Sequence, residues 1–214
     1  EKIANANGLV VVYGVAASVV NKGDVLVYCN LEIQEVKRRY GKGLDNWGAK
    51  NYDEEFLRKE KRYTFLEGRV QEWHKRPLLE SLDYMIDCNN PEYPIMISGD
   101  TFRHVMDEFV KRPFKCVPFF NPGIWGGHWI KKVIGAGQDL PNTAWGITGI
   151  IDFQGVQAKC GDNIVKFQGK DIELYKPIDF LGGQVFYLFG YRCPVTLDFL
   201  DTWGGGNLSL QCHP

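Results

Sequence analysis

The side chains best suited to bind a metal ion lie in the last residues of the sequence. Residues 207–213 (NLSLQCH) alternate polar and apolar types, and alternate side chains of a β-strand point to opposite faces. Such a strand would place Asn207, Ser209, Gln211 and His213 on one face. The Gln211 amide oxygen and the His213 imidazole could bind one side of a Zn²⁺ ion, although catalytic zinc normally takes three protein ligands and a water. An ordinary half-exposed strand without a ligand is the alternative.

The other histidines do not complete such a site. His74, His104 and His128 have no cysteine or carboxylate at a spacing typical of metal ligands. We therefore expect each of them to be structural or exposed, and two more zinc ligands would have to come from elsewhere.

Two segments resemble the class I mannose-6-phosphate isomerases, which are zinc-dependent enzymes with the cupin fold. Residues 207–214 (NLSLQCHP) resemble the family's LS-aliphatic-Q-x-HP motif. Residues 121–127 (NPGIWGG) resemble the P-x-WGG segment that opens the family's catalytic domain. The two motifs follow each other in the family's order, and the resemblance covers residues 113–214, about half of the chain.

The resemblance implies a set of site residues and a reaction. It implies that Gln211 and His213 are the first two zinc ligands, that Ser209 contacts the substrate, and that Trp125 either forms the pocket wall or serves in packing. Asn207 is a further candidate for substrate binding, although many members of the family carry a Lys shortly before the Leu-Ser pair, where this chain has Gly205, Gly206 and Asn207. The substrate would be a small sugar phosphate, and the reaction would interconvert mannose 6-phosphate and fructose 6-phosphate in carbohydrate metabolism. Zinc would polarise the carbonyl while a base moves a proton through an enediol.

The catalytic base is unknown from the sequence. Asp198 and Asp201 are candidates, but turn or strand-edge roles suit both of them. The family's remaining two ligands, a Glu and a His on later strands, have no counterpart before residue 214. We therefore expect this chain to be a fragment of a longer polypeptide, inactive as an isomerase on its own and weak in zinc binding.

Four arginines form a possible phosphate-binding set in the N-terminal half. Arg62, Arg69 and Arg76 recur every seven residues, and Arg58 lies one turn before them, so all four share a face if one continuous helix carries them. A solvated helix face is the alternative. This region is similar to the lid and the following strand of P-loop nucleoside or nucleotide kinases, but no GxxxxGK[ST] motif occurs in the sequence.

Residues 1–112 predict an α/β domain with a parallel, kinase-like sheet. Continuous apolar runs predict three strands, over residues 8–13, 24–29 and 83–88. The first run is typical of a strand buried on both faces, which needs neighbouring strands. We expect residues 30–82 to be mostly helical and residues 101–110 to form an amphipathic helix.

Residues 113–214 predict the beginning of an all-β cupin barrel, because short alternating runs are broken by Gly and Pro. The expected strands cover residues 114–120, 144–153, 163–168, 171–175, 184–189, 194–199 and 207–213. Gly204, Gly205 and Gly206 are interpreted as a close approach between strands. The predicted fold class is therefore mixed α+β in two domains.

The charge and composition of the sequence limit which partners the protein can bind. Over 214 residues, 25 basic and 26 acidic side chains give a net charge of -1, so no overall field attracts nucleic acid or an anionic membrane. No apolar run approaches the ~18 residues that a membrane-spanning helix needs. Six widely spaced cysteines without a CxxC pair favour reduced thiols and a cytoplasmic location. Strand faces left uncovered in a fragment would favour self-association.

Two other functions are compatible with these patterns. The chain could contain a cupin that holds a sugar without turnover, with the N-terminal domain as a sensor or scaffold. Alternatively, it could belong to a kinase-like enzyme in which the cupin is regulatory.

Overall fold

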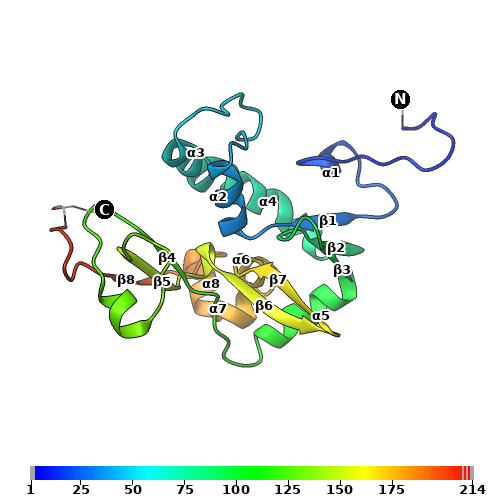
Figure 1. Ribbon diagram of the computed structural model, residues 1–214. Helices are drawn as coiled ribbons and strands as arrows, with labels where there is room; N and C mark the ends of the chain where they lie inside the picture. The colour runs from blue at the N-terminus through cyan, green and yellow to red at the C-terminus, as the bar shows by residue number, and fades with distance from the viewer. Residues whose placement is uncertain (1–2, 209, 211, 213–214) are drawn as a thin grey trace. The chain divides into compact units, whose positions relative to one another are not determined.

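The computed structural model describes residues 3–208, 210 and 212 (Figure 1). It is a mixed α/β structure with three small sheets, and these described residues form no closed barrel. The chain divides into two compact units. The first unit holds residues 1–30 and 35–105, and the second holds residues 31–34 and 106–214. The division therefore falls after Val105, where the sequence suggested residue 112.

The first unit is built on a three-stranded sheet in the order β1-β2-β3. Strands β1 (Val27–Asn30) and β2 (Tyr84–Asp87) are parallel, whereas β3 (Ile95–Ser98) is antiparallel to β2. The expected strands at 24–29 and 83–88 are thus present, and the strand at 95–98 was missed. Because β3 is antiparallel, the sheet is mixed and does not show a fully parallel, kinase-like arrangement.

Helices connect β1 to β2 and follow β3. Their bounds are α2 (Ile33–Gly41), α3 (Phe56–Arg62), the π-helix η1 (Tyr63–Glu67), α4 (Gly68–Leu79) and α5 (Gly99–Phe109). These elements confirm the expected helical region 30–82 and the helix at 101–110. Apolar residues of these helices and of the sheet form the core. Leu79 of α4, Leu82 after α4, Met85 of β2 and Phe102 of α5 are almost fully buried.

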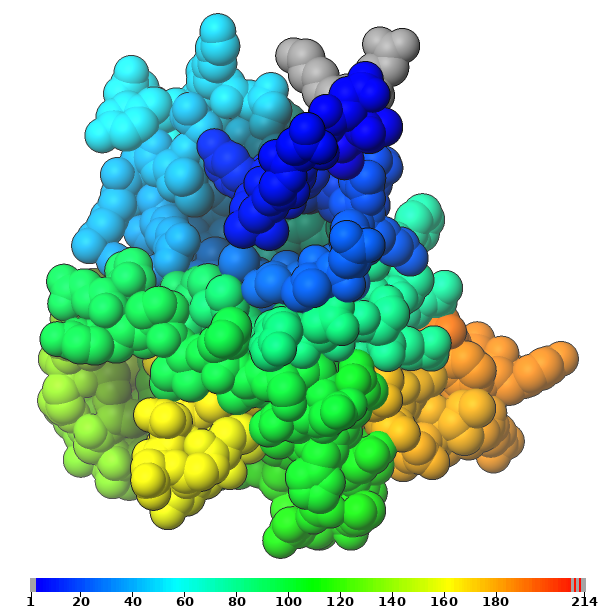
Figure 2. All heavy atoms as spheres, turned by 90° about the vertical axis from the view of Figure 1, so that its right-hand side faces the viewer, coloured from blue at the N-terminus to red at the C-terminus, as the bar shows by residue number. Residues whose placement is uncertain are grey.

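The strand expected at residues 8–13 is absent from the structure. Leu9 is 94% exposed and Tyr13 is 90% exposed, and residues 9–13 have no regular secondary structure. Figure 2 shows this segment in dark blue on the outside of the molecule. A strand exists only when another strand satisfies its backbone groups, and the short helix α1 (Ala17–Val20) is the first regular element among the described residues.

The second unit contains two antiparallel sheets. Strands β4 (Phe119–Asn121), β5 (Trp145–Gly149) and β8 (Leu197–Leu200) form one sheet in the order β4-β5-β8. Strands β6 (Gly155–Cys160) and β7 (Asn163–Gln168) form a hairpin, drawn in yellow in Figure 1. The strand β6 was missed by the sequence analysis, and β4, β5 and β8 cover only parts of the expected strands.

Two helices replace strands that the sequence predicted in this unit, α6 (Lys170–Tyr175) and α8 (Gly183–Phe189), and a third helix, α7 (Pro177–Leu181), lies between them. The strands expected at 171–175 and 184–189 are therefore wrong, and so is the expectation of an all-β second half. Helices of one or two turns are too short to show a 3.6-residue period, and in α6 every residue from 170 to 174 is buried.

Two shorter helical elements complete the second unit. They are the π-helix η2 (Ile130–Ile134) and the 3₁₀-helix η3 (Ile151–Phe153). None of the helices in the described ranges combines the length and the apolar character that crossing a membrane requires.

Candidate functional site

Two segments about eighty residues apart in the sequence lie side by side in the second unit. The backbone N–H of Gly127 donates to the carbonyl of Asp201 at 2.6 Å, and the N–H of His128 donates to the carbonyl of Trp203 at 3.0 Å. The N–H of Gly206 donates to the carbonyl of Trp125 at 3.1 Å. The structure thus brings the segment 121–127 against the residues that lead into the segment 207–213.

Glycines make this approach possible. A Cβ atom on Gly205 would lie 2.4 Å from the Trp125 carbonyl oxygen, and one on Gly127 would lie 2.3 Å from Oδ1 of Asp201. Carbon atoms of folded proteins do not come so close, so only residues without a side chain fit here. Close approach of backbone, expected for residues 204–206, is thus found at Gly205, whereas a Cβ atom on Gly204 would have no atom within 4 Å, and the segments that meet are not strands.

The carboxylate of Asp201 holds the two segments together. Its Oδ2 accepts hydrogen bonds from the backbone N–H of Ile130 at 2.8 Å and from the Thr143 hydroxyl at 3.0 Å. Its Oδ1 accepts one from the N–H of Trp203 at 3.1 Å. Because the side chain is buried and bonded to three donors, its geometry suits a positioning residue rather than a base that must receive a substrate proton.

Asn142 fixes the turn that begins the tryptophan segment. Its Oδ1 accepts from the N–H of Gly123 and its Nδ2 donates to the carbonyl of the same residue, both at 2.9 Å. The sequence analysis missed this residue. An Asn that follows Pro141 in a loop indicates a turn, but it does not say which distant backbone the amide will bind.

Four tryptophans lie in this unit, and three of them gather at the junction. The rings of Trp125 and Trp145 pack edge to face with their centroids 5.2 Å apart. The exposed ring of Trp203 has the ammonium of Lys132 at 4.7 Å from its centroid. Aromatic faces beside a cation can bind a ligand that carries an apolar face and a negative charge.

The proposed ligands Gln211 and His213, and the proposed substrate contact Ser209, lie outside the described residues. The described residues of the expected strand 207–213 have no strand structure. Asn207 is described and is exposed. Among the residues that the structure describes, no group of three or more His, Cys, Asp or Glu side chains could hold a metal ion. Amide oxygen and imidazole nitrogen are suitable donors for zinc, but two donors are fewer than the three that a catalytic site takes. The fit to zinc is therefore incomplete in this chain.

The four arginines of the N-terminal half do not form one even row. The π-helix η1 lies between Arg62 and Arg69, and i→i+5 bonding inserts about one extra residue into the helix. Arg62 pairs with Glu67 at 2.9 Å and Arg69 pairs with Glu72 at 3.3 Å. Phosphate binding by Arg58, Arg62, Arg69 and Arg76 remains a prediction, but the charges of two of them are engaged within the protein.

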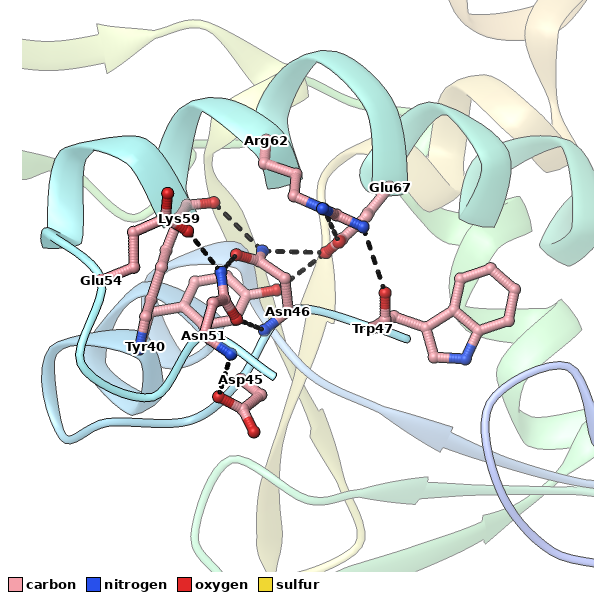
Figure 3. Close-up of polar contacts among 9 residues, drawn as sticks. All are labelled: Tyr40, Asp45, Asn46, Trp47, Asn51, Glu54, Lys59, Arg62 and Glu67. Atoms are coloured by element: carbon pink, nitrogen blue, oxygen red, sulfur yellow. Dashed lines mark hydrogen bonds and ion pairs between the residues drawn. The ribbon is translucent and has the colours of Figure 1, made fainter. Parts of the chain in front are cut away.

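Arg62 belongs to a buried polar network in the first unit (Figure 3). The Tyr40 hydroxyl and the Asn46 amide each donate to Oε2 of Glu67 at 3.1 Å, while Arg62 donates to Oε1. Burial raises the pKa of Tyr40, and the nearby charge of Glu67 adds to this effect. The network ties α2, the loop after it and η1 together, and the close-up shows the Trp47 ring outside it.

These features define a two-unit α/β protein with a glycine-rich, tryptophan-lined junction in its second unit. The family model described as "Domain of unknown function (DUF8485)" matches residues 1–111, which is just over half of the chain. The chain therefore belongs to this family. No curated protein and no solved structure matches the chain.

Proposed function

We propose that residues 113–214 are part of an aldose-ketose isomerase that interconverts mannose 6-phosphate and fructose 6-phosphate. The observation that carries the proposal is the junction of Trp125, Gly126 and Gly127 with residues 201–206. The segment 121–127 resembles one motif of the isomerase family, and residues 201–206 lead into the segment 207–214, which resembles the second motif. The contact of 121–127 with residues 201–206, about eighty residues away, supports a common role.

The finer architecture belongs to the same proposal. Residues 113–214 would be the beginning of a cupin barrel, to which the antiparallel sheet β4-β5-β8 would contribute. Residues 1–112 would be a kinase-like domain, as the parallel pair β1 and β2 suggests. All six cysteines are free thiols, which supports a cytoplasmic location.

The residues of this chain would bind and orient the sugar phosphate. Trp125 and Trp203 would contact the apolar face of the sugar, and Lys132 beside Trp203 would attract the phosphate. Asp201 and Asn142 would hold these elements in place. Bound zinc would supply Lewis-acid polarisation of the sugar carbonyl. Gln211 and His213 provide only two of the three protein ligands that a catalytic zinc takes.

A sugar-binding module without turnover is the second candidate. The donor count favours it, because Gln211 and His213 supply two ligands and the described residues hold no cluster of three further donors. In that case the N-terminal unit would act as a sensor or scaffold.

Titration calorimetry with mannose 6-phosphate, with and without zinc, tests the proposal. We expect binding that weakens about tenfold or more in Trp125→Ala, because a ring that contacts ligand is lost. Trp73→Ala is the matched control, since Trp73 is an exposed tryptophan of the first unit. If the intact chain does not bind mannose 6-phosphate or fructose 6-phosphate, the proposal is wrong.

Proton exchange at C2 of the sugar separates the two candidates. Isomerase chemistry in D₂O places deuterium at this carbon through the enediol, which NMR of the sugar detects. Binding without deuterium incorporation would favour the sugar-binding module. Metal analysis of the intact chain and of His213→Ala reports whether His213 contributes to zinc binding.

A further inference from the structure

The second unit contains a buried cluster of charges outside the junction. The ammonium of Lys170 contacts Oδ1 of Asp152 at 2.7 Å, Oε2 of Glu173 at 2.5 Å and the carbonyl of Tyr191 at 2.8 Å. The side chains of Lys170, Glu173 and Asp152 are 4%, 0% and 20% exposed. Two carboxylates therefore share one ammonium in a site that water hardly reaches.

This charge balance is unfavourable for Glu173. Asp152 competes with Glu173 for the ammonium of Lys170, and burying an ionised carboxylate beside a second one is costly. Asp152 is partly solvated, so this cost is greater at Glu173. Burial raises the pKa of Glu173 to about 7, with the neighbouring Asp152 contributing in the same direction and Lys170 opposing it.

Glu173 also holds a loop. Its Oε1 accepts a hydrogen bond from the backbone N–H of Cys193 at 3.0 Å, and the Tyr191 carbonyl is bound to Lys170. Residues 190–196 connect α8 to β8, and β8 leads to Asp201. The 190–196 loop is therefore hydrogen-bonded to both Glu173 and Lys170, and a movement of this loop would break both contacts.

We propose that the 190–196 loop is a proton-sensitive latch, closed when Glu173 carries a proton and opening when Glu173 ionises. An ionised carboxylate is more stable in water than beneath the closed loop. The closed state therefore holds the proton more tightly than the open state. By linkage, a rise in pH must favour the state that binds fewer protons, which is the open one.

Other titratable groups around Glu173 do not account for the same change. Lys170 and Asp152 are the charged partners that set the balance. Cys116 feels the charge of Glu173, but burial raises the pKa of its thiol further above neutrality. Asp171 is two residues from Glu173 in α6, and side chains at this spacing do not face each other on a helix.

The alkylation rate of Cys193 tests the latch. Cys193 is half-buried, and its thiol donates to the carbonyl of Val195 in the same loop at 3.2 Å. The rate is followed by peptide mass spectrometry in the intact chain and in Glu173→Gln, which imitates the protonated side chain. Dividing the two rates at each pH cancels the pH effects that the intact chain and Glu173→Gln share.

We expect the rate ratio of the intact chain to Glu173→Gln to rise more than tenfold between about pH 5 and pH 7 and to level off above pH 7. This window lies between the pKa of a solvated Glu and the raised pKa of the closed state. A ratio that stays flat across this window would overturn the proposal.

Asp152→Asn provides a second, independent arm. In this variant Glu173 no longer shares the ammonium of Lys170 with a second carboxylate. The ionised form of Glu173 is therefore more stable when the loop is closed. We therefore expect the rise in the rate ratio to move to lower pH and to become smaller. A rise at higher pH would contradict the proposed balance. Neither arm depends on sugar binding or turnover, so the latch can fail or succeed independently of the proposed isomerase function.

Discussion

Lys59 is an ammonium buried in the first unit, where it holds the loop that follows α2. Its Nζ donates to the carbonyls of Leu44 at 3.2 Å and Tyr52 at 2.6 Å, and only 1% of the residue is exposed. Buried charges are tolerated where strong hydrogen bonds replace water. Lys59 thus links two distant points of the same loop to α3.

Replacing Lys59 with Met should destabilise the first unit by roughly 2 kcal/mol, because the backbone carbonyls of Leu44 and Tyr52 lose a charged donor. Lys61→Met is the matched control, since Lys61 lies two residues away in α3 and is exposed. Urea unfolding of both variants measures the difference. Equal free energies of unfolding for the two would show that the buried ammonium does not hold the loop.

The sequence could not reveal these buried charges. Lys59, Glu67, Lys170 and Glu173 appear as ordinary surface residues, because a linear pattern of apolar residues says nothing about which charges will be paired in the interior. By contrast, the glycine run 204–206 could be interpreted from its residue type as a close approach of backbone. The sequence did not say which segment it would approach, and the structure shows Gly205 beside Trp125 and Gly126.

At the scale of elements, the π-helix η1 decides which side chains α3 and α4 present. It carries Tyr63 and Glu67, both buried. Each residue turns a helix by about 100°, so the extra residue in η1 brings Glu67 to face Tyr40 and Asn46. Seven-residue spacing in the sequence predicts that Arg62 and Arg69 share one helix face. The extra residue in η1 is the physical reason why they do not.

Deleting Phe65 should convert η1 to ordinary α-helix and turn Glu67 away from its partners. Phe65 is exposed, so the deletion removes little buried surface. We expect a loss of roughly 2 kcal/mol or more in the free energy of unfolding, because buried polar groups of the network lose their partners. The comparison is Phe65→Ala, which keeps the residue count.

Circular dichroism and urea unfolding measure both variants. Helical content should stay similar, since the deleted chain can still form a helix. If the deletion costs no more than the substitution, the register set by η1 does not matter for stability.

Whether a predicted helix or strand is present in the structure depends on its length and on what packs against it. The region from α2 to α4 and the helix α5 were predicted correctly because several turns repeat one pattern. The segments 171–175 and 184–189 were assigned to strands because their β-branched and aromatic residues favour strands, while tertiary packing made them helices. Residues 8–13 have the composition of a buried strand, yet the described structure gives them no partner, and composition cannot supply one.

At the scale of the whole molecule, each of the two units contains buried apolar residues. Leu79 and Phe102 belong to the first unit, while Val156 and Phe167 belong to the second. Apolar residues also remain uncovered, including Leu9 near the N-terminus and Leu197 and Phe199 in the edge strand β8. The self-association expected from the sequence would bury such residues, and it remains a prediction.

The division into two compact units predicts separate responses to mutation. Lys59→Met acts within the first unit. Asp201→Asn acts within the second, where an amide that replaces the carboxylate places an N–H group among the donors from Ile130, Thr143 and Trp203. We expect Asp201→Asn to cost roughly 2 kcal/mol, because hydrogen bonds to a buried charge are lost and one donor faces another.

The double variant tests whether these units unfold independently. Substitutions at distant, uncoupled sites add within about 0.5 kcal/mol. Urea unfolding should therefore show two transitions, with Lys59→Met lowering the midpoint of one and Asp201→Asn lowering the midpoint of the other. The double variant should show both shifts unchanged. A single transition that both substitutions move, or a coupling energy above about 1 kcal/mol between them, would mean that the two cores fold as one cooperative structure.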